Sequence, residues 1–126
     1  MIKRIKSNSA FEDKVGYCRV VVAGGFAHVA GTVAPGPDVS DNVADQCKSA
    51  LAVIETALLD ANCGFQDVVR VRYILPNRHD FKACWPVLSA TFGANPPVAT
   101  MIESGLIDPK YKIEIEVTAL LPKSAT

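Results

Sequence analysis

Apolar and polar residues alternate in two segments of the chain, a pattern that is typical of half-buried β-strands. Residues 67–75 alternate valine, tyrosine and leucine with two arginines, and residues 111–120 alternate isoleucine and valine with lysine, glutamate and threonine. A third strand is expected at residues 98–103. The two alternating strands are expected to turn one face toward a core and to carry polar side chains on the other.

The N-terminal third of the chain predicts a β-hairpin. Residues 17–23 are rich in valine, a Gly-Gly pair follows as a two-residue turn, and residues 26–32 resume with small and β-branched residues. A short strand at residues 2–6 can join the edge of this hairpin. Residues 33–38 contain two prolines and one glycine, so we expect a loop there, because proline cannot donate to a sheet.

The next segment predicts an amphipathic helix, because its apolar residues recur every three or four positions. Ser40 or Asp41 is the expected N-cap, and the helix is expected to end near Gly64. Its apolar positions are Val43, Cys47, Ala50, Leu51, Ile54, Leu58 and Ala61.

A second helix is expected to run from an Asp80 cap to about residue 92, with Pro86 confined to an early turn or a kink. Its apolar stripe consists of Phe81, Trp85, Leu88 and Phe92. The predicted order is therefore β(β)β-α-β-α-β-β, an α+β fold that occupies residues 1–126 as one domain.

Two helices cover only one face of such a sheet. The other face carries Arg70, Arg72, Glu114 and Glu116, which can form ion pairs between strands. This face is expected to be hydrated or to meet other copies of the chain, and we favour an oligomer.

The composition limits the classes of function. Thirteen lysines and arginines balance thirteen aspartates and glutamates, so no net charge attracts nucleic acid or anionic lipid. No apolar run approaches the roughly 20 residues that span a bilayer, and the N-terminus lacks the apolar region of a signal peptide. We therefore expect a cytoplasmic protein without nucleic-acid or membrane partners.

The cysteines and histidines give no sign of a metal or redox site. Cys18, Cys47, Cys63 and Cys84 form no C-x-x-C pair, and His28 and His79 lack further ligands at metal-binding spacing. We expect reduced thiols, no metal and no cofactor.

Several short strings, in their order and spacing, resemble the RidA family of reactive intermediate deaminases, also called YjgF. The strings are Gly16-Tyr17-Cys18-Arg19, Ala30-Gly31-Thr32, Met101-Ile102-Glu103 and Lys112-Ile113-Glu114-Ile115-Glu116-Val117. The resemblance covers nearly the whole chain. It implies a chorismate mutase-like mixed sheet with two helices on one face, a homotrimer, and small-molecule clefts between adjacent subunits.

The chain departs from the family pattern where the substrate is anchored. In the family, an arginine in a Pro-x-Arg string binds the substrate carboxylate, and the enzyme hydrolyses imines or enamines to keto acids and ammonia. Residues 97–100 read Pro-Val-Ala-Thr here, so Ala99 occupies the arginine position and offers no donor. Met101 replaces a common cysteine and Ala30 a common serine. The Tyr-x-Arg string and the Arg-x-Arg strand resemble a branch without this anchor.

The resemblance assigns candidate roles to residues that match the pattern. Glu114 is the candidate catalytic residue that orients water, and Tyr17 is the catalytic candidate that lines the pocket and donates a hydrogen bond. An ion pair of Glu114 with Arg70 or Arg72, and a role for Tyr17 as an interface aromatic, are the alternatives. The candidate substrate-binding residues are Arg19, Gly31, Arg72, Trp85, Ala99, Thr100 and Met101.

Arg19 is the candidate replacement for the missing anchor, because a residue two positions after Tyr17 projects from the same face of a strand. An ion pair with Glu103 or Glu116 is the competing interpretation and the one we favour slightly. Arg72 has the same two interpretations. Trp85 is expected more strongly as a core or interface residue than as a ligand contact.

Two functions fit these features. The first is an imine or enamine deaminase-type hydrolase with an altered substrate, and the alternative is a non-catalytic metabolite-binding or regulatory trimer. A small organic acid or imine is the expected ligand. RNA cleavage is opposed by the neutral charge and by the lack of a stripe rich in lysine and arginine.

Overall fold

The computed structural model describes residues 1–123. Its core is a six-stranded sheet in the order β1-β2-β3-β6-β4-β5, in which β4 and β5 are parallel and the other neighbours antiparallel. The elements are β1 (Lys3–Ile5), α1 (Ala10–Val15), β2 (Val20–Ala23), β3 (Phe26–Thr32), α2 (Val43–Asp60), η1 (Phe65–Asp67), β4 (Val68–Leu75), η2 (Arg78–Cys84), α3 (Trp85–Phe92), β5 (Val98–Glu103) and β6 (Glu114–Leu120).

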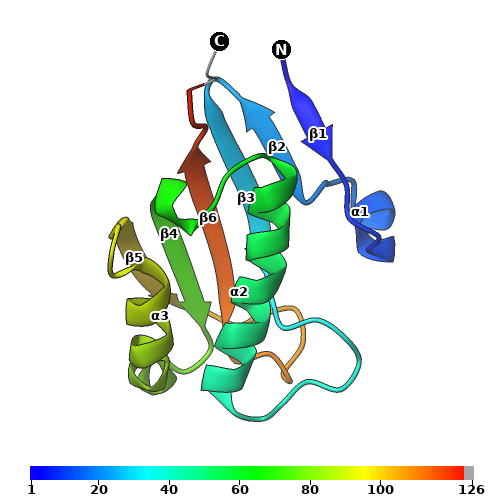
Figure 1. Ribbon diagram of the computed structural model, residues 1–126. Coiled ribbons are helices and arrows are strands. Elements are labelled where there is room, and N and C mark those ends of the chain that lie inside the picture. The colour runs from blue at the N-terminus through cyan, green and yellow to red at the C-terminus, as the bar shows by residue number, and fades with distance from the viewer. Residues whose placement is uncertain (124–126) are drawn as a thin grey trace.

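The layered α+β architecture confirms the predicted fold class. Figure 1 shows α2 and α3 on the same face of the sheet, with the last strand, β6, between β3 and β4. The core forms where the apolar stripe of α2 meets the inner faces of these three strands. Ile54 and Leu58 of α2 and Ile115 of β6 are fully buried there.

The N-terminal hairpin forms as predicted. Gly24 and Gly25 join β2 to β3 with φ angles of 61° and 85°, the left-handed conformation that a two-residue hairpin turn requires. Strand β1 pairs with the edge of β2. The predicted start of the second strand at residue 17 is wrong, because β2 begins at Val20.

The helix α1, which the sequence analysis did not predict, occupies the connection between β1 and β2. Ser9 caps its first turn by accepting a hydrogen bond from the Phe11 N–H, and Gly16 ends it with a left-handed φ of 87°. Glu12 is 2% exposed and accepts hydrogen bonds from the Ser7 amide and hydroxyl. Burial raises the pKa of Glu12, but the two bonds from Ser7, together with the positive charge of Arg19 and a backbone hydrogen bond from Ser9, hold the pKa below its ordinary value.

The helix α2 and the segment formed by η2 and α3 differ from the predictions in three details. Asn42, and not Ser40 or Asp41, caps α2, because its side chain accepts the Asp45 N–H at 3.0 Å. The expected helix from Asp80 begins as the 3₁₀ segment η2, and α3 follows with Pro86 in its first turn. Trp85 does not join the core stripe, since it is 53% exposed.

The face of the sheet opposite the helices is open in the single chain. Arg72 Nη1 forms an ion pair with Glu116 Oε1 at 3.1 Å on this face. Strand register and alternation place four exposed large apolar residues on the same face, which are Phe26, Val98, Ile102 and Leu120. An open face of this mixed character suits contact with another copy of the chain.

Candidate functional site

A pocket of about 860 Å³ lies where α1, the end of β3 and the start of β6 meet. Tyr17, Arg19, Gly31 and Glu114 contribute to its wall, although they are up to 97 positions apart in the sequence. The loops after β3 and before β6 supply the remaining sides. The structure therefore brings together four of the nine predicted site residues.

Arg19 is held by contacts inside the pocket wall. Its Nη1 donates to the Gly31 carbonyl at 3.3 Å and to Thr32 Oγ1 at 3.0 Å, and its Nη2 lies 3.5 Å from the Tyr17 hydroxyl. The guanidinium carbon is also 5.7 Å from the centre of the Tyr17 ring. The expected ion pair of Arg19 with Glu103 or Glu116 is wrong, because these polar contacts tie the side chain to β3 and to Tyr17.

Glu114 presents a half-buried carboxylate to the same pocket. Burial raises the pKa of Glu114, the negative charge of Glu116 raises it further, and the positive charge of Arg19 partly opposes both. The alternative ion pair with Arg70 or Arg72 is wrong for residues 1–123, because Arg72 pairs with Glu116 and no ion pair joins Glu114 to either arginine. A carboxylate with a raised pKa is suited to accept a proton near neutral pH.

Gly31 makes room for this carboxylate. A Cβ at position 31 would overlap Glu114 Oε2, whereas the backbone conformation of Gly31 is accessible to other residues. The glycine therefore allows the close approach of a side chain and does not serve a turn. Its carbonyl also accepts the Arg19 hydrogen bond, so Gly31 adjoins both the Arg19 guanidinium and the Glu114 carboxylate.

Replacing Gly31 with alanine is expected to displace the Glu114 carboxylate and to reduce the rate of imine hydrolysis, the reaction that the family resemblance implies, on the order of 100-fold. The thermal midpoint should change little, because the end of a flexible side chain can move aside. Gly105→Ala is the matched control, since a Cβ there has nothing within 4 Å. Equal initial rates for the two variants, measured as ammonia release, would contradict a role for the position of Glu114.

The family model described as endoribonuclease L-PSP matches residues 7–121. The chain belongs to this family. A crystal structure of a YjgF family member from Mycobacterium tuberculosis shares 36% sequence identity and a TM-score of 0.87, with coverage of 96% of this chain and 100% of that one. The predicted RidA/YjgF resemblance and its fold are thereby confirmed.

Two relatives of this L-PSP family chain are similar over nearly their whole length. An uncharacterized protein of Streptomyces coelicolor is 30% identical over 122 residues, which are 94% of this chain and 91% of the relative. The human 2-iminobutanoate/2-iminopropanoate deaminase is 26% identical over 125 residues, which are 95% of this chain and 91% of the relative.

Five of the residues predicted for the L-PSP family site lie outside this pocket. Arg72 instead lines a hollow of about 230 Å³ on the open face of the sheet, together with its partner Glu116. The exposed Trp85 contacts solvent, with Lys82 Nζ 5.8 Å from its ring centre. Ala99, Thr100 and Met101 belong to the edge strand β5.

Gln46 is a buried polar residue of this L-PSP family chain that the sequence analysis missed. Its Nε2 donates to the Ser40 carbonyl at 2.7 Å and to the Lys110 carbonyl at 2.9 Å, and its Oε1 accepts the Lys112 N–H at 2.8 Å. One side chain thus joins α2 to the loops on both sides of the pocket. A glutamine in register with the apolar stripe, four residues before Ala50, was the available signal.

Two absences among the described residues bear on the kind of site. Within residues 1–123, no cluster of three or more histidine, cysteine, aspartate or glutamate side chains has the arrangement of a metal site. Over the same residues, no helix has the length and apolar character needed to cross a membrane.

Proposed function

We propose that this protein hydrolyses the carbon–nitrogen bond of an imine, or of an enamine after its conversion to the imine, in the pocket that Glu114 and Arg19 line. The observation that carries the proposal is the half-buried Glu114 carboxylate, whose pKa is raised and which lines an open pocket together with Tyr17 and Arg19. The human relative that is named for deamination of 2-iminobutanoate and 2-iminopropanoate supports the same reaction class.

The reaction needs one water molecule and a group that moves its protons. The water oxygen forms a bond to the imine carbon while the Glu114 carboxylate takes a water proton, and Glu114 then passes this proton to the nitrogen, which gives the carbinolamine. In the second half of the reaction Glu114 takes the hydroxyl proton of the carbinolamine and delivers it to the amine nitrogen. The carbon–nitrogen bond breaks, ammonia leaves, and the oxygen becomes the carbonyl of the product. Tyr17 is proposed to donate a hydrogen bond that orients the substrate.

Arg19 is the proposed contact for the charged end of the substrate. Its Nη1 is occupied by Gly31 and Thr32, whereas its Nη2 has, among residues 1–123, only the long 3.5 Å contact to Tyr17. A substrate carboxylate can replace that long contact and gain a charge-assisted hydrogen bond. Ala99 cannot provide such a bond, so we propose that the substrate differs from that of family members with an arginine there.

We further propose a homotrimer in which the β5 edge of a neighbouring subunit approaches each pocket. The exposed apolar residues of the open sheet face support an assembly. In this arrangement Ala99, Thr100 and Met101, with Arg72 and Trp85 nearer the periphery, complete the cleft from the neighbouring subunit.

We expect a trimeric mass for wild type and a monomeric mass for the Leu120→Glu variant, because the variant places a charge on the apolar part of the open face. Native mass spectrometry measures this shift directly. The control is Leu59→Glu, at an exposed apolar residue of α2 on the other face of the sheet. A wild-type protein that is monomeric at micromolar concentration would refute the trimer.

The test of the proposed activity is ammonia release from imines that an amino-acid oxidase generates in situ, measured for wild type and for Ala99→Arg. We expect wild type to accelerate hydrolysis above the spontaneous rate. Activity in the Ala99→Arg variant alone would mean that the wild-type chain keeps the family fold but does not catalyse this reaction. Specific binding of a keto acid without turnover in either protein would favour the alternative, a non-catalytic metabolite-binding or regulatory trimer.

RNA cleavage is not proposed, despite the family's description. The pocket is lined by two basic residues, Arg19 and Lys110, and two acidic residues, Asp108 and Glu114, so its charges balance. A site that follows a phosphate backbone is expected to be predominantly basic.

A further inference from the structure

The outer part of the pocket carries large apolar side chains that the proposed chemistry does not use. Phe11 and Val15 of α1 are 59% and 68% exposed, and Ile107 of the loop before β6 is 78% exposed. All three line the same pocket as Glu114. Three large apolar side chains around one opening form a patch of the kind that binds an apolar group.

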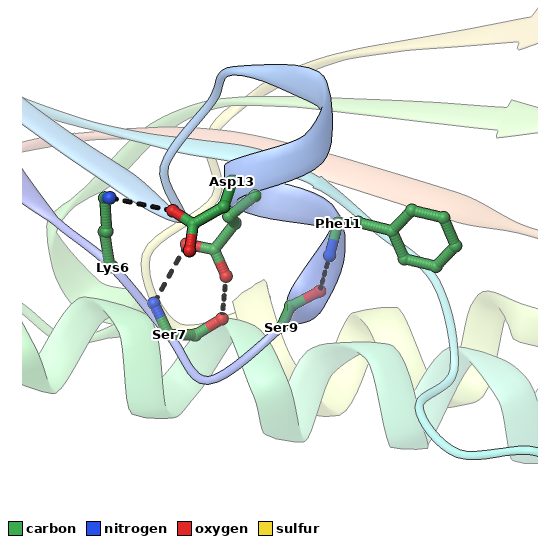
Figure 2. Close-up of polar contacts among 6 residues, drawn as sticks. Lys6, Ser7, Ser9, Phe11 and Asp13 are labelled. Carbon is green, nitrogen blue, oxygen red and sulfur yellow. Dashed lines mark hydrogen bonds and ion pairs between the residues drawn. The ribbon is translucent and has the colours of Figure 1, made fainter.

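The helix that carries two of these side chains is tied to the preceding segment by polar contacts. The buried Glu12 binds the Ser7 amide and hydroxyl, and Lys6 Nζ lies 2.9 Å from Asp13 Oδ1. Figure 2 shows that the ring of Phe11 projects away from these contacts. The ring is therefore free to contact a ligand while its backbone stays in place.

The less exposed and the more exposed residues of the pocket wall differ in chemistry. Glu114, Tyr17 and Arg19 are partly buried and supply charge and hydrogen-bonding groups. Phe11, Val15 and Ile107 are more exposed and offer no hydrogen-bonding side chain.

We propose that the substrate of this protein is an imine with a large apolar substituent, aromatic or branched aliphatic, which binds against Phe11, Val15 and Ile107 while the imine carbon faces Glu114. This inference rests on the proposed function for the reaction, and it adds the substrate class. Phe11 and Ile107 are then specificity-determining residues, and they act on substrate binding without taking part in proton transfer.

The experiment compares imines that an amino-acid oxidase generates from alanine, leucine and phenylalanine. Wild type is expected to show kcat/KM at least about 10-fold higher for the phenylalanine-derived imine than for the alanine-derived one, because apolar contacts discriminate on this scale. Phe11→Ser and Ile107→Ser should remove most of this preference, because they lower kcat/KM for the phenylalanine-derived imine more than for the alanine-derived one. Leu59→Ser is the matched control, because Leu59 is 63% exposed but lies outside the pocket.

A binding measurement separates failure of this inference from failure of the proposed function. Isothermal titration calorimetry with pyruvate and phenylpyruvate, the keto acid products, requires no turnover. Tighter phenylpyruvate binding that is lost in Phe11→Ser supports the apolar subsite even if no imine is hydrolysed, and in that case only the proposed reaction fails.

Three results would overturn the inference. The first is equal or better hydrolysis of the alanine-derived imine, which would leave the proposed reaction intact. The second is a change of oligomeric mass in Phe11→Ser but not in Leu59→Ser, because the outer side chains would then contact a neighbouring subunit. The third is the absence of any preference for phenylpyruvate over pyruvate in wild type.

Discussion

Replacement of Glu114 with glutamine is expected to reduce imine hydrolysis at least about 100-fold, because the amide keeps the size of the carboxylate but cannot accept the water proton. The measurement is kcat/KM for ammonia release at neutral pH. Glu55→Gln is the matched control, since Glu55 is exposed on α2 and lies outside the pocket. Similar losses in both variants, or none in either, would remove Glu114 from the chemistry.

The pH dependence of the rate gives a second measurement of the same group. Burial and the neighbouring Glu116 raise the pKa of Glu114, so activity is expected to fall on the acid side with a midpoint above the ordinary value of 4.5. Glu116→Gln removes one of these causes and should move that midpoint to lower pH. A midpoint that does not respond to Glu116 would assign the acid limb to another group.

The same shift has a consequence for stability. A carboxylate whose pKa is raised by folding binds its proton more tightly in the folded state, so its contribution is present below the unfolded pKa and is lost as pH rises through the folded pKa. Glu114→Gln is therefore expected to have a higher thermal midpoint than wild type at neutral pH, and the difference should vanish in acid. The variant would be more stable and less active.

Replacement of Gln46 with alanine is expected to destabilise the fold by about 3 kcal/mol, because it leaves two carbonyls and one N–H without partners in a buried position. Chemical denaturation in urea measures the loss as a lower midpoint. The same change should lower activity under folding conditions, since it releases both loops that flank the pocket.

Gln66→Ala is the control for this substitution, because Gln66 is exposed in η1. We expect its midpoint to lie close to that of wild type. An equal urea midpoint for Gln46→Ala and the control would show that water replaces the three hydrogen bonds without loss of stability. Gln46 would then not be the residue that connects the two loops.

Periodic segments were predicted well because burial is what creates their pattern. The stripe from Val43 to Ala61 and the alternation of residues 67–75 each record which side of an element meets the core, and the structure has α2 and β4 there. Trp85 shows the limit of this reasoning. Its spacing from Phe81 and Leu88 suits a helix, but residues before it form a 3₁₀ segment, whose different turn places Trp85 in solvent.

The helix α1 was missed although its signals are local. Ser9, Glu12 and Gly16 have the spacing of an N-cap, a glutamate at the third position of the helix and a C-terminal glycine. Six residues, however, are too few to show a helical period. Phe11 and Val15 were consequently not considered as pocket residues. Short helices carry little periodic information, so their capping residues have to be examined first.

The sequence alone determined the α+β class, the family, the hairpin, and the candidacy of Tyr17, Arg19, Gly31 and Glu114. These features depend on local periodicity, turn chemistry and the order of short strings. Only the tertiary structure decided three pairings. Arg19 donates a hydrogen bond to the Gly31 carbonyl and forms no ion pair within residues 1–123, Glu116 forms an ion pair with Arg72, and Gln46 connects two loops by hydrogen bonds. Each of these pairings depends on distances between residues that are far apart in the chain. Strand register decides which of several possible partners comes close to a charged residue, and the sequence does not show that register.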